Sequence, residues 1–354
     1  METSNTRRRQ ETRRARLVRL FEWSVWAGVG AFFVALAFGA LYRTDPAASG
    51  PIETRLVFLA LLIQSFAFHA GIGVALACVG VVALRRRRLG AALGLGAALL
   101  LGPAAASHLP SRRPGASDDD LVVLSANVLY TNEDPSGLIA LVRELEPDVV
   151  VIQEYRASWS DALARELGGA YPHMVELPGG GAQGAAVLSD RPFLERPRFA
   201  PEGWSWGNPM PLVTIEHAGK RVEIGCVHLW APLSWEAVAQ QRRQAAMVGA
   251  WAAGRLARED APAALILAGD FNAPYRTNHL RELRAAGLRE AHDEVGVGRG
   301  ATWGPRRAAL SWAPGIRLDH VMYAGEIACT GTGVGPDIGS DHRPVWGRFR
   351  IGSD

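Results

Sequence analysis

Two hydrophobic patterns divide the chain near residue 115. Before it, apolar residues form long runs without a formal charge; after it, short β-rich runs alternate with segments of helical spacing. A run of about 20 apolar residues can cross a bilayer core, whereas short apolar runs bounded by turn residues are typical of buried strands. We therefore predict a membrane part followed by a soluble α/β domain.

The membrane part contains three uncharged stretches between a basic N-terminus and a polar linker. The N-terminus covers residues 1–22, the stretches 23–42, 56–84 and 89–110, and the linker 111–120. A cleaved signal peptide does not account for three such stretches. Pro103 and several glycines weaken the third. We predict three transmembrane helices, with the third as the one on which sidedness depends.

Arginine placement predicts the orientation. Seven Arg precede the first stretch, and Arg85–Arg88 separate the second from the third. Basic segments next to membrane spans stay in the cytoplasm. Three spans then put the soluble domain outside the cytoplasm, in a multi-pass protein of the cell membrane, whereas two spans would leave that domain inside.

The soluble domain, residues 121–354, mixes strands and helices. Predicted strands cover 121–128, 148–154, 171–177, 184–189, 212–216, 221–228, 265–270, 318–323, 326–330 and 344–351, and predicted helices cover 136–145, 158–167, 235–258 and 277–286. Some neighbouring strands read as hairpins, and many are apolar on both faces. This combination indicates β-sheets packed on each other and covered by helices.

The charge of the two parts of the chain limits the class of substrate. Residues 1–114 carry 15 basic and 5 acidic residues, and residues 115–354 carry 23 and 30, a net charge of −7. Because DNA affinity is largely phosphate neutralisation by Lys and Arg, this balance argues against nucleic acid as the substrate.

The three cysteines, Cys78, Cys226 and Cys329, show no C-x-x-C spacing. We expect free thiols, with a Cys226–Cys329 bridge as the alternative.

Polar residues recur at the predicted strand ends. They are Asn127, Glu154, His228, Asp270 with Asn272, Asp319 with His320, and Asp341 with His342. Taken singly, such a residue is commonly a turn former or a buried histidine. Their repeated occurrence at strand ends predicts a single site.

These residues lie in motifs that resemble the endonuclease/exonuclease/phosphatase (DNase I-like) family. The motifs are S-A-N (125–127), I-Q-E (152–154), V-H-L (227–229), G-D-F-N (269–272), R-L-D-H (317–320) and S-D-H-R-P (340–344). The resemblance covers residues 121–351. It implies a four-layer α/β sandwich, two sheets face to face with helices outside, and hydrolysis of a phosphoester with Mg²⁺, or alternatively Mn²⁺. The predicted membrane arrangement resembles the bacterial teicoplanin-resistance membrane proteins of this family.

The resemblance also implies roles for individual residues. It gives Glu154 as the principal metal-binding carboxylate and Asp341 as a second carboxylate that helps at the metal or at His342. Asn127, which is also a candidate metal ligand, and Asn272 match amides that hold metal-bound water or phosphate oxygens. Asp270 matches the group that orients or deprotonates the attacking water. His342 lies at the scissile phosphate with Asp319 fixing its tautomer, and His228 is a candidate acid. The assignment of general acid and base stays open. Three further residues are candidates for substrate binding, with surface or packing roles as alternatives: Arg156, Trp230 and Trp303.

We therefore expect a membrane-anchored, metal-dependent phosphoesterase that acts on a lipid-linked phosphate, diphosphate or phosphodiester at the outer face of the membrane. Its partners would be the lipid bilayer and a phosphorylated lipid, because anchoring confines the site near lipid head groups. One alternative is a membrane-bound nuclease that degrades extracellular nucleic acid. Another is a membrane binding protein that has kept the fold without turnover.

Overall fold

The computed structural model describes residues 2–42, 50–83, 85–109, 115–201, 210–304 and 314–352. The predictions that fall on Leu84, on residues 110–114 and on Trp312, a further loop tryptophan near the motifs, lie outside these ranges. The chain divides into two units. One comprises Met1–Tyr42 and Leu62–Ala104, and the other, the globular unit, comprises Arg43–Leu61 and Ala105–Asp354.

Four helices precede the globular fold: α1 (Glu2–Leu41), α2 (Pro51–Ser65), α3 (Ala67–Ala83) and α4 (Arg87–Ala106). Among the described residues, α4 is the one helix that is long and apolar enough by itself to cross a membrane. The pair α2 and α3 meets this criterion only together and is bent by 60°, and the apolar stretch of α1, Trp23–Gly39, is shorter.

The prediction of three transmembrane helices is therefore not confirmed. The second predicted stretch, residues 56–84, is not one straight helix but bends between α2 and α3. Its beginning belongs to the globular unit, where the Arg55 guanidinium lies 5.0 Å from the Trp235 ring centre.

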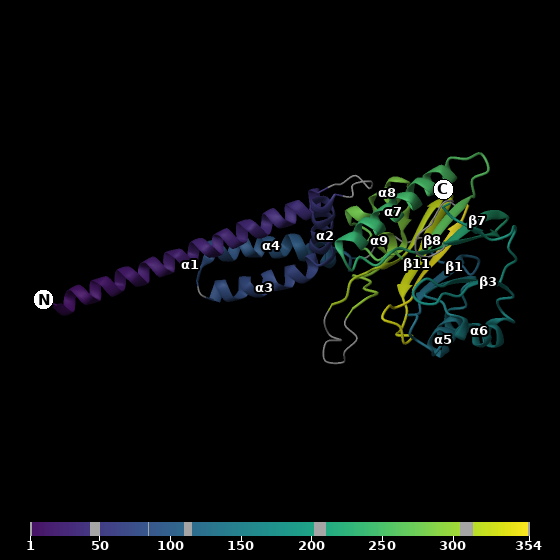
Figure 1. Ribbon diagram of the computed structural model, residues 1–354, viewed down its shortest axis with the longest axis horizontal. Coiled ribbons are helices and arrows are strands. Elements are labelled where there is room, and N and C mark those ends of the chain that lie inside the picture. The colour runs from purple at the N-terminus through teal and green to yellow at the C-terminus, as the bar shows by residue number, and fades with distance from the viewer. Residues whose placement is uncertain are drawn as a thin grey trace. The chain divides into compact units, whose positions relative to one another are not determined.

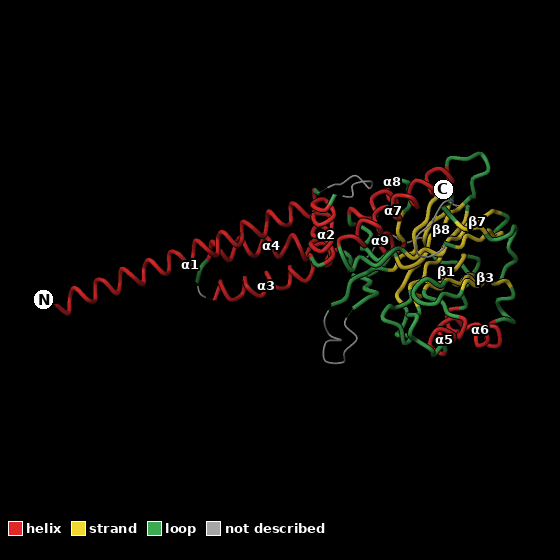
Figure 2. Tube along the Cα trace, in the orientation of Figure 1, coloured by secondary structure: helices red, strands yellow, loops and turns green. Residues whose placement is uncertain are grey.

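Among the described residues of the globular unit, twelve strands form two six-stranded sheets. Figures 1 and 2 show how these strands are arranged. The first sheet has the order β11-β12-β1-β2-β4-β3 and the second β5-β6-β7-β8-β10-β9. Their bounds are β1 Leu121–Asn127, β2 Val149–Gln153, β3 His173–Leu177, β4 Ala185–Ser189, β5 Arg198–Phe199, β6 Pro211–His217, β7 Lys220–His228, β8 Ala264–Asp270, β9 Arg289–Glu290, β10 Asp319–Gly325, β11 Ile327–Val334 and β12 Val345–Ile351.

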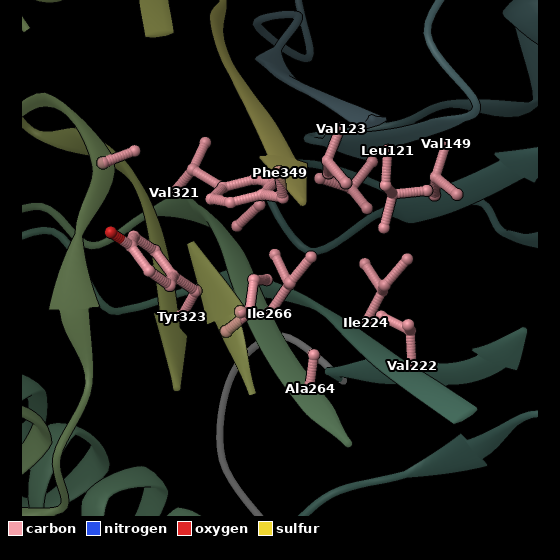
Figure 3. Close-up of a cluster of buried hydrophobic side chains, with 14 of the residues drawn as sticks. Leu121, Val123, Val149, Val222, Ile224, Ala264, Ile266, Val321, Tyr323 and Phe349 are labelled. Carbon is pink, nitrogen blue, oxygen red and sulfur yellow. The ribbon is translucent and has the colours of Figure 1, made fainter. Parts of the chain in front are cut away.

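A shared core joins the two sheets. Figure 3 shows Leu121, Val123 and Val149 of the first sheet above Ile224 and Ile266 of the second, and all five are fully buried. A second apolar cluster lies between the first sheet and the helices α5 (Ser136–Leu145) and α6 (Ser160–Leu167). Two packed sheets flanked by helices confirm the predicted α/β sandwich.

The other helices lie beside the second sheet (Figure 1). They are α7 (Trp235–Leu256), η2 (Asn278–Leu280), α8 (Arg281–Ala285) and α9 (Ala291–Val295), and η1 (Ala157–Trp159) precedes α6. The sequence did not predict β5, β9 or α9, because elements of two to five residues carry too little periodicity. Cys78, Cys226 and Cys329 are free thiols, as expected.

One parallel strand pair in each sheet brings polar strand ends together. In β1 and β2, Asn127 pairs with Gln153. In β7 and β8, His228 pairs with Asp270, and the antiparallel strand β10 begins opposite them at Asp319. The carboxyl ends of parallel strands meet at one edge of a sheet, so both sheets deliver functional groups to the same end of the sandwich.

Candidate active site

Two of the predicted site residues have a left-handed backbone conformation, and at Glu154 this conformation is strained. Glu154, directly after β2, has φ +60°, and Asn272, two residues after β8, has φ +50°. L-residues other than Asn and Asp rarely adopt this left-handed conformation. Such strain costs about 1–3 kcal/mol and concentrates at functional sites, where the surrounding structure holds it. The turn at Glu154 aims its carboxylate back across the end of β1, where it meets Asn127.

The glycine of the G-D-F-N motif leaves no room for a side chain. Gly269 lies in β8 beside Val227 of β7, and a Cβ atom at this position would stand 1.8 Å from the Val227 carbonyl oxygen. A side chain would push the two parallel strands apart. Gly269 therefore permits the close approach that places Asp270 next to His228.

Asp270 is the centre of the site, and three hydrogen bonds hold its carboxylate. Its Oδ2 accepts from Asn127 Nδ2 at 3.1 Å and from Asn272 Nδ2 at 3.0 Å, while its Oδ1 accepts from the Asn272 backbone N–H at 2.8 Å. Asn127 Nδ2 also donates to Glu154 Oε1 at 3.1 Å. The two asparagines are thus hydrogen-bond donors that hold the Asp270 and Glu154 carboxylates in place. Burial raises the pKa of Asp270 above its ordinary value.

His342 and Asp319 form a buried pair. His342 Nδ1 lies 2.7 Å from Asp319 Oδ2, and its Nε2 lies 3.7 Å from Asp270 Oδ2. Burial opposes protonation of the ring, but the Asp319 and Asp270 charges outweigh it and raise the pKa of His342 to about 10. His342 is therefore an imidazolium near neutral pH. Its Nε2–H faces the centre of the site.

The second histidine is in the opposite state. His228 Nε2 lies 3.6 Å from Asp270 Oδ2 and 4.0 Å from Glu154 Oε1. Burial lowers the pKa of His228, although the neighbouring Asp270 works against this shift. The site therefore combines a neutral imidazole and a charged one, and both Nε2 atoms approach the same Asp270 oxygen, Oδ2.

Glu154 and Asp341 fit a hard divalent cation. Burial raises the pKa of Glu154, and the nearby Asp341 charge adds to the increase. Asp341 Oδ1 is buried and has no hydrogen-bond partner among the described residues. The Glu154 carboxylate and the Asp341 oxygen without a hydrogen-bond partner are oxygen ligands of the kind that Mg²⁺ prefers. Asn127 Oδ1 already accepts from the Leu129 N–H at 3.0 Å, so this residue orients Glu154.

A different group among the described residues, Asp270 with Asp319 and His342, has ligand atoms within 4.8 Å of one another. We favour Glu154 and Asp341 as the metal site, because Asp319 is already paired with His342 and Asp270 is held by amide donors.

The three predicted substrate-binding residues lie around this site. Trp303 pairs through its backbone with His342, and Trp230 follows His228 by two residues. Arg156 Nη1 donates to the Tyr130 carbonyl at 3.1 Å, and the Tyr130 N–H donates to Glu154 Oε2 at 2.9 Å. Arg156 is thereby engaged with the loop that positions Glu154.

Sequence reasoning missed the supporting side chains. Gln241 Nε2 donates to the Asn272 carbonyl at 2.8 Å, and Gln244 Oε1 accepts from the Trp230 N–H at 2.7 Å. Thr302 Oγ1 accepts from the Asp319 N–H at 3.1 Å. Gln241 and Gln244 are three residues apart in α7, so they share a helix face. Their polarity on the buried face of an otherwise regular helix was the available signal.

His320, the remaining motif residue, has a structural position. Its Nε2 lies 3.0 Å from the Ala273 carbonyl and its Nδ1 3.4 Å from Glu290 Oε1. Arg317 Nη2 donates to the same Glu290 oxygen at 2.9 Å. Glu290 and His320 are buried, and they link β9 and β10 to the loop after Asp270.

A carboxylate-rich end of a two-sheet sandwich, with two histidines in opposite protonation states, defines a phosphoester hydrolase. The Endonuclease/Exonuclease/phosphatase family matches residues 124–342, more than half of the chain. The chain belongs to this family and is a metal-dependent phosphoester hydrolase. No curated protein matches it.

Solved structures agree on the fold. D. rerio TDP2 complexed with a single-strand DNA product is 19% identical with a TM-score of 0.53, over 66% of this chain and 100% of that one. The 3′ phosphatase NExo from Neisseria, bound to a product DNA hairpin, is 19% identical with a TM-score of 0.53, over 65% and 99%. An endonuclease/exonuclease/phosphatase from Beutenbergia cavernae is 23% identical with a TM-score of 0.51, over 68% and 72%.

Proposed function

We propose that this protein is a membrane-anchored phosphoesterase that uses Mg²⁺ to hydrolyse a lipid-linked phosphate, diphosphate or phosphodiester at the outer face of the cell membrane. The observation that carries the substrate class is an aromatic rim, formed by Tyr130, Trp230 and Trp303, each 39% exposed. Each is joined to a site residue: Tyr130 to Glu154 by a hydrogen bond, Trp230 to His228 by sequence, and Trp303 to His342 by backbone pairing.

This rim supports a lipid rather than a nucleic acid. Amphipathic Trp and Tyr side chains favour the interface between water and lipid. Nucleic-acid affinity instead depends on Lys and Arg, and residues 115–354 carry a net charge of −7. A substrate with one phosphate group and a long apolar tail suits an acidic domain with an aromatic entrance.

The contact between Arg55 and Trp235 supports the proposed sidedness. These residues lie in one unit, so residue 55 and residue 235 share one side of the membrane. The chain must then cross an even number of times between them. The bent pair α2–α3 and the helix α4 supply two crossings. A protein in which α4 alone failed to cross would separate the two residues. With α1 as a further span, the arginine-rich N-terminus stays in the cytoplasm and the site outside.

The proposed chemistry begins with a water at Asp270. Glu154 and Asp341 would hold the metal, which when bound polarises the phosphoester and stabilises its negative charge. Asp270 takes the water proton while the water oxygen forms its bond to phosphorus and the ester P–O bond breaks. A carboxylate with a raised pKa is a better general base near neutral pH than an ordinary one. Asn127 and Asn272 keep the Asp270 oxygens in place.

The charged histidine, His342, stabilises the negative charge that develops in the transition state. His342, as an imidazolium held by Asp319, donates from Nε2 to the phosphoryl group or to the leaving oxygen. The transition state concentrates negative charge at these oxygens, so a preorganised cationic donor stabilises it more than the substrate. His228, kept neutral by burial and 3.6 Å from the same Asp270 oxygen, would supply a second hydrogen bond to the phosphoryl group.

A membrane-bound nuclease is the second candidate. The neighbours that favour it are the TDP2 structure with single-strand DNA and the NExo structure with a DNA hairpin. Both structures are less than 25% identical to this chain, so each likeness supports the shared fold alone.

A substrate panel separates the candidates. Full-length protein in lipid nanodiscs would be assayed with Mg²⁺ and with EDTA on phospholipids, polyprenyl phosphates and diphosphates, single-stranded DNA and RNA. We expect metal-dependent release from a lipid-linked phosphoester. Cleavage of nucleic acid together with intact lipids would favour the nuclease and refute the lipid proposal. Absence of hydrolysis on the whole panel would contradict both.

A further inference from the structure

The globular unit carries an exposed apolar surface beside the aromatic rim. The loop after His228 reads L-W-A-P-L-S-W over residues 229–235. Within it, Leu233 is 87% exposed, and Trp230 and Trp235 are exposed as well. Water makes a leucine exposed to this degree unfavourable, and the chain gives it no cover within the described residues.

The first part of α2 extends this surface. Between Pro51 and Leu61 the helix belongs to the globular unit. Thr54, Val57 and Leu61 are buried, whereas Ile52 and Leu59 are exposed. At 100° per residue, the buried and the exposed residues lie on opposite sides of the helix. One side therefore packs in the protein, and the other presents aliphatic side chains outward.

The stacking of Arg55 on Trp235 joins the two parts. The guanidinium lies 5.0 Å from the ring centre. Such a contact fixes the start of α7, and with it the loop that precedes Trp235, beside the first part of α2. We call the exposed residues of the helix and the loop, Ile52, Leu59, Leu233 and Trp235, the interfacial patch.

We propose that the interfacial patch lies on the lipid bilayer and that the active site takes its substrate from that surface. This inference rests on the proposed function, because it assumes that residues from Leu62 onward enter the membrane. Arg55 and Leu62 are seven residues apart in α2, about 10 Å along the helix axis. Trp235, stacked on Arg55, is therefore held within reach of the bilayer edge. The interfacial region of a bilayer, several ångströms deep, accommodates Trp and Leu side chains of this kind.

A second contact inside the globular unit lies at the segment that follows α4. The Gly298 N–H donates to the Ser107 carbonyl at 2.9 Å, directly after the last residue of α4. The globular unit thus contacts both chain segments that lead into the predicted membrane helices, at Arg55 and at Ser107. The loop of Trp230 and Leu233 then connects the bilayer surface to His228.

Lipid proximity can be measured at Leu233 in the full chain. Cys226 and Cys329 are buried, so Cys78→Ser leaves the protein without an accessible thiol among the described cysteines. In this background, Leu233→Cys would carry an environment-sensitive NBD label, in nanodiscs of phosphatidylcholine and phosphatidylglycerol. The matched control is Ala170→Cys, an exposed position after α6. We expect blue-shifted emission and quenching by doxyl-labelled lipids at position 233 and neither at position 170.

Equal, water-like emission at both positions would overturn the proposal. Blue-shifted emission without lipid quenching, together with a disulfide crosslink between two unlabelled copies of the Leu233→Cys variant, would mean that a second copy covers the patch and would overturn it too. The label reports on the surface alone. If no lipid in the panel is hydrolysed but the label at position 233 is quenched, the proposed function fails while the bilayer contact stands.

Activity gives a second test. Leu233→Asp should reduce the hydrolysis of a substrate embedded in the bilayer at least about tenfold, since a buried carboxylate opposes contact with lipid. The rate on bis(4-nitrophenyl) phosphate, which is soluble, should stay unchanged. Ala170→Asp should affect neither rate. Equal losses on both substrates in Leu233→Asp would indicate a disturbed site and contradict the proposal.

Discussion

His342 Nδ1 lies 2.7 Å from Asp319 Oδ2, with both side chains buried at the end of the sandwich. The two residues come from different segments, one from the start of β10 and the other from the loop before β12. The carboxylate keeps the ring protonated and points its Nε2 at Asp270. The pair is therefore a cationic donor that is oriented before the substrate arrives.

Removal of the Asp319 charge should abolish this state. Asp319→Asn keeps the shape but lowers the pKa of His342 and admits the wrong tautomer. We expect kcat to fall roughly 10²- to 10⁴-fold, as for other buried carboxylate–histidine pairs. Initial rates on a small phosphodiester measure the effect. Asp293→Asn, which removes an exposed carboxylate paired with Arg276, is the control and should be neutral. A fall below threefold in Asp319→Asn would refute the role.

Glu154→Gln tests the metal site. The amide keeps the size of the side chain but removes the charge that neutralises a cation, so the Mg²⁺ concentration for half-maximal activity should rise roughly tenfold or more. Calorimetric titration of Mg²⁺ would measure the same loss without turnover. The exposed Glu166→Gln, beside Arg143, provides the matched control. An unchanged Mg²⁺ affinity in Glu154→Gln would place the metal elsewhere.

Gly269→Ala should be severely destabilising. Its Cβ would collide with the Val227 carbonyl, and separating β7 from β8 costs roughly 3–5 kcal/mol in the free energy of unfolding. Gly254→Ala, at an exposed position of α7, has no neighbour within 4 Å and should stabilise by roughly 0.5–1 kcal/mol. Thermal unfolding of the two variants checks both signs. A native midpoint for Gly269→Ala would show that the strands tolerate the extra atom.

Buried His279 should make the protein sensitive to acid. Burial lowers its pKa to about 3, whereas an unfolded chain has a histidine pKa of about 6.5. Between these values the unfolded state binds one more proton, so stability falls as the pH drops from about 6.5 towards about 3. The slope from this residue is about 1.4 kcal/mol per pH unit.

The variant His279→Gln should flatten this dependence, because it removes the proton that the unfolded state gains. Chemical unfolding at pH 7 and pH 5 measures the difference for both proteins. A wild-type protein equally stable at the two values, or a variant with the same slope, would contradict the assignment.

The sequence predicted the site better than its surroundings. Asn127, Glu154, His228 and Asp270 end strands that are apolar on both faces, and a polar residue in such a place is visible without an alignment. The hydrogen bond from Gln241 to the Asn272 carbonyl is not visible in this way, because it depends on how α7 lies on the sheet. Roles of the individual site residues stay predictions until the variants above are measured.

The membrane part was harder to predict for a physical reason. Apolar composition alone cannot distinguish a helix that lies in lipid from one that packs on protein, and α2 combines both features in a single run. Residues 56–61 counted as span by composition. The stacking of Arg55 on Trp235 shows that the beginning of α2 packs on the globular unit. This contact joins residues that are 180 positions apart, so composition does not reveal it.

The placement of Pro51–Leu61 in the globular unit has a consequence for biosynthesis. His279 lies against the backbone of Val57 in α2, and its Nδ1 is 2.9 Å from Gln241 Oε1, whose amide holds the loop of Asn272. This helix leaves the ribosome long before the strands that it supports. On the proposed topology it must wait outside the membrane until α3 and α4 are inserted and residues 115–352 have followed. Completion of the catalytic loop is then coupled to complete insertion, so a chain in which one of the two crossings fails would not assemble an active site.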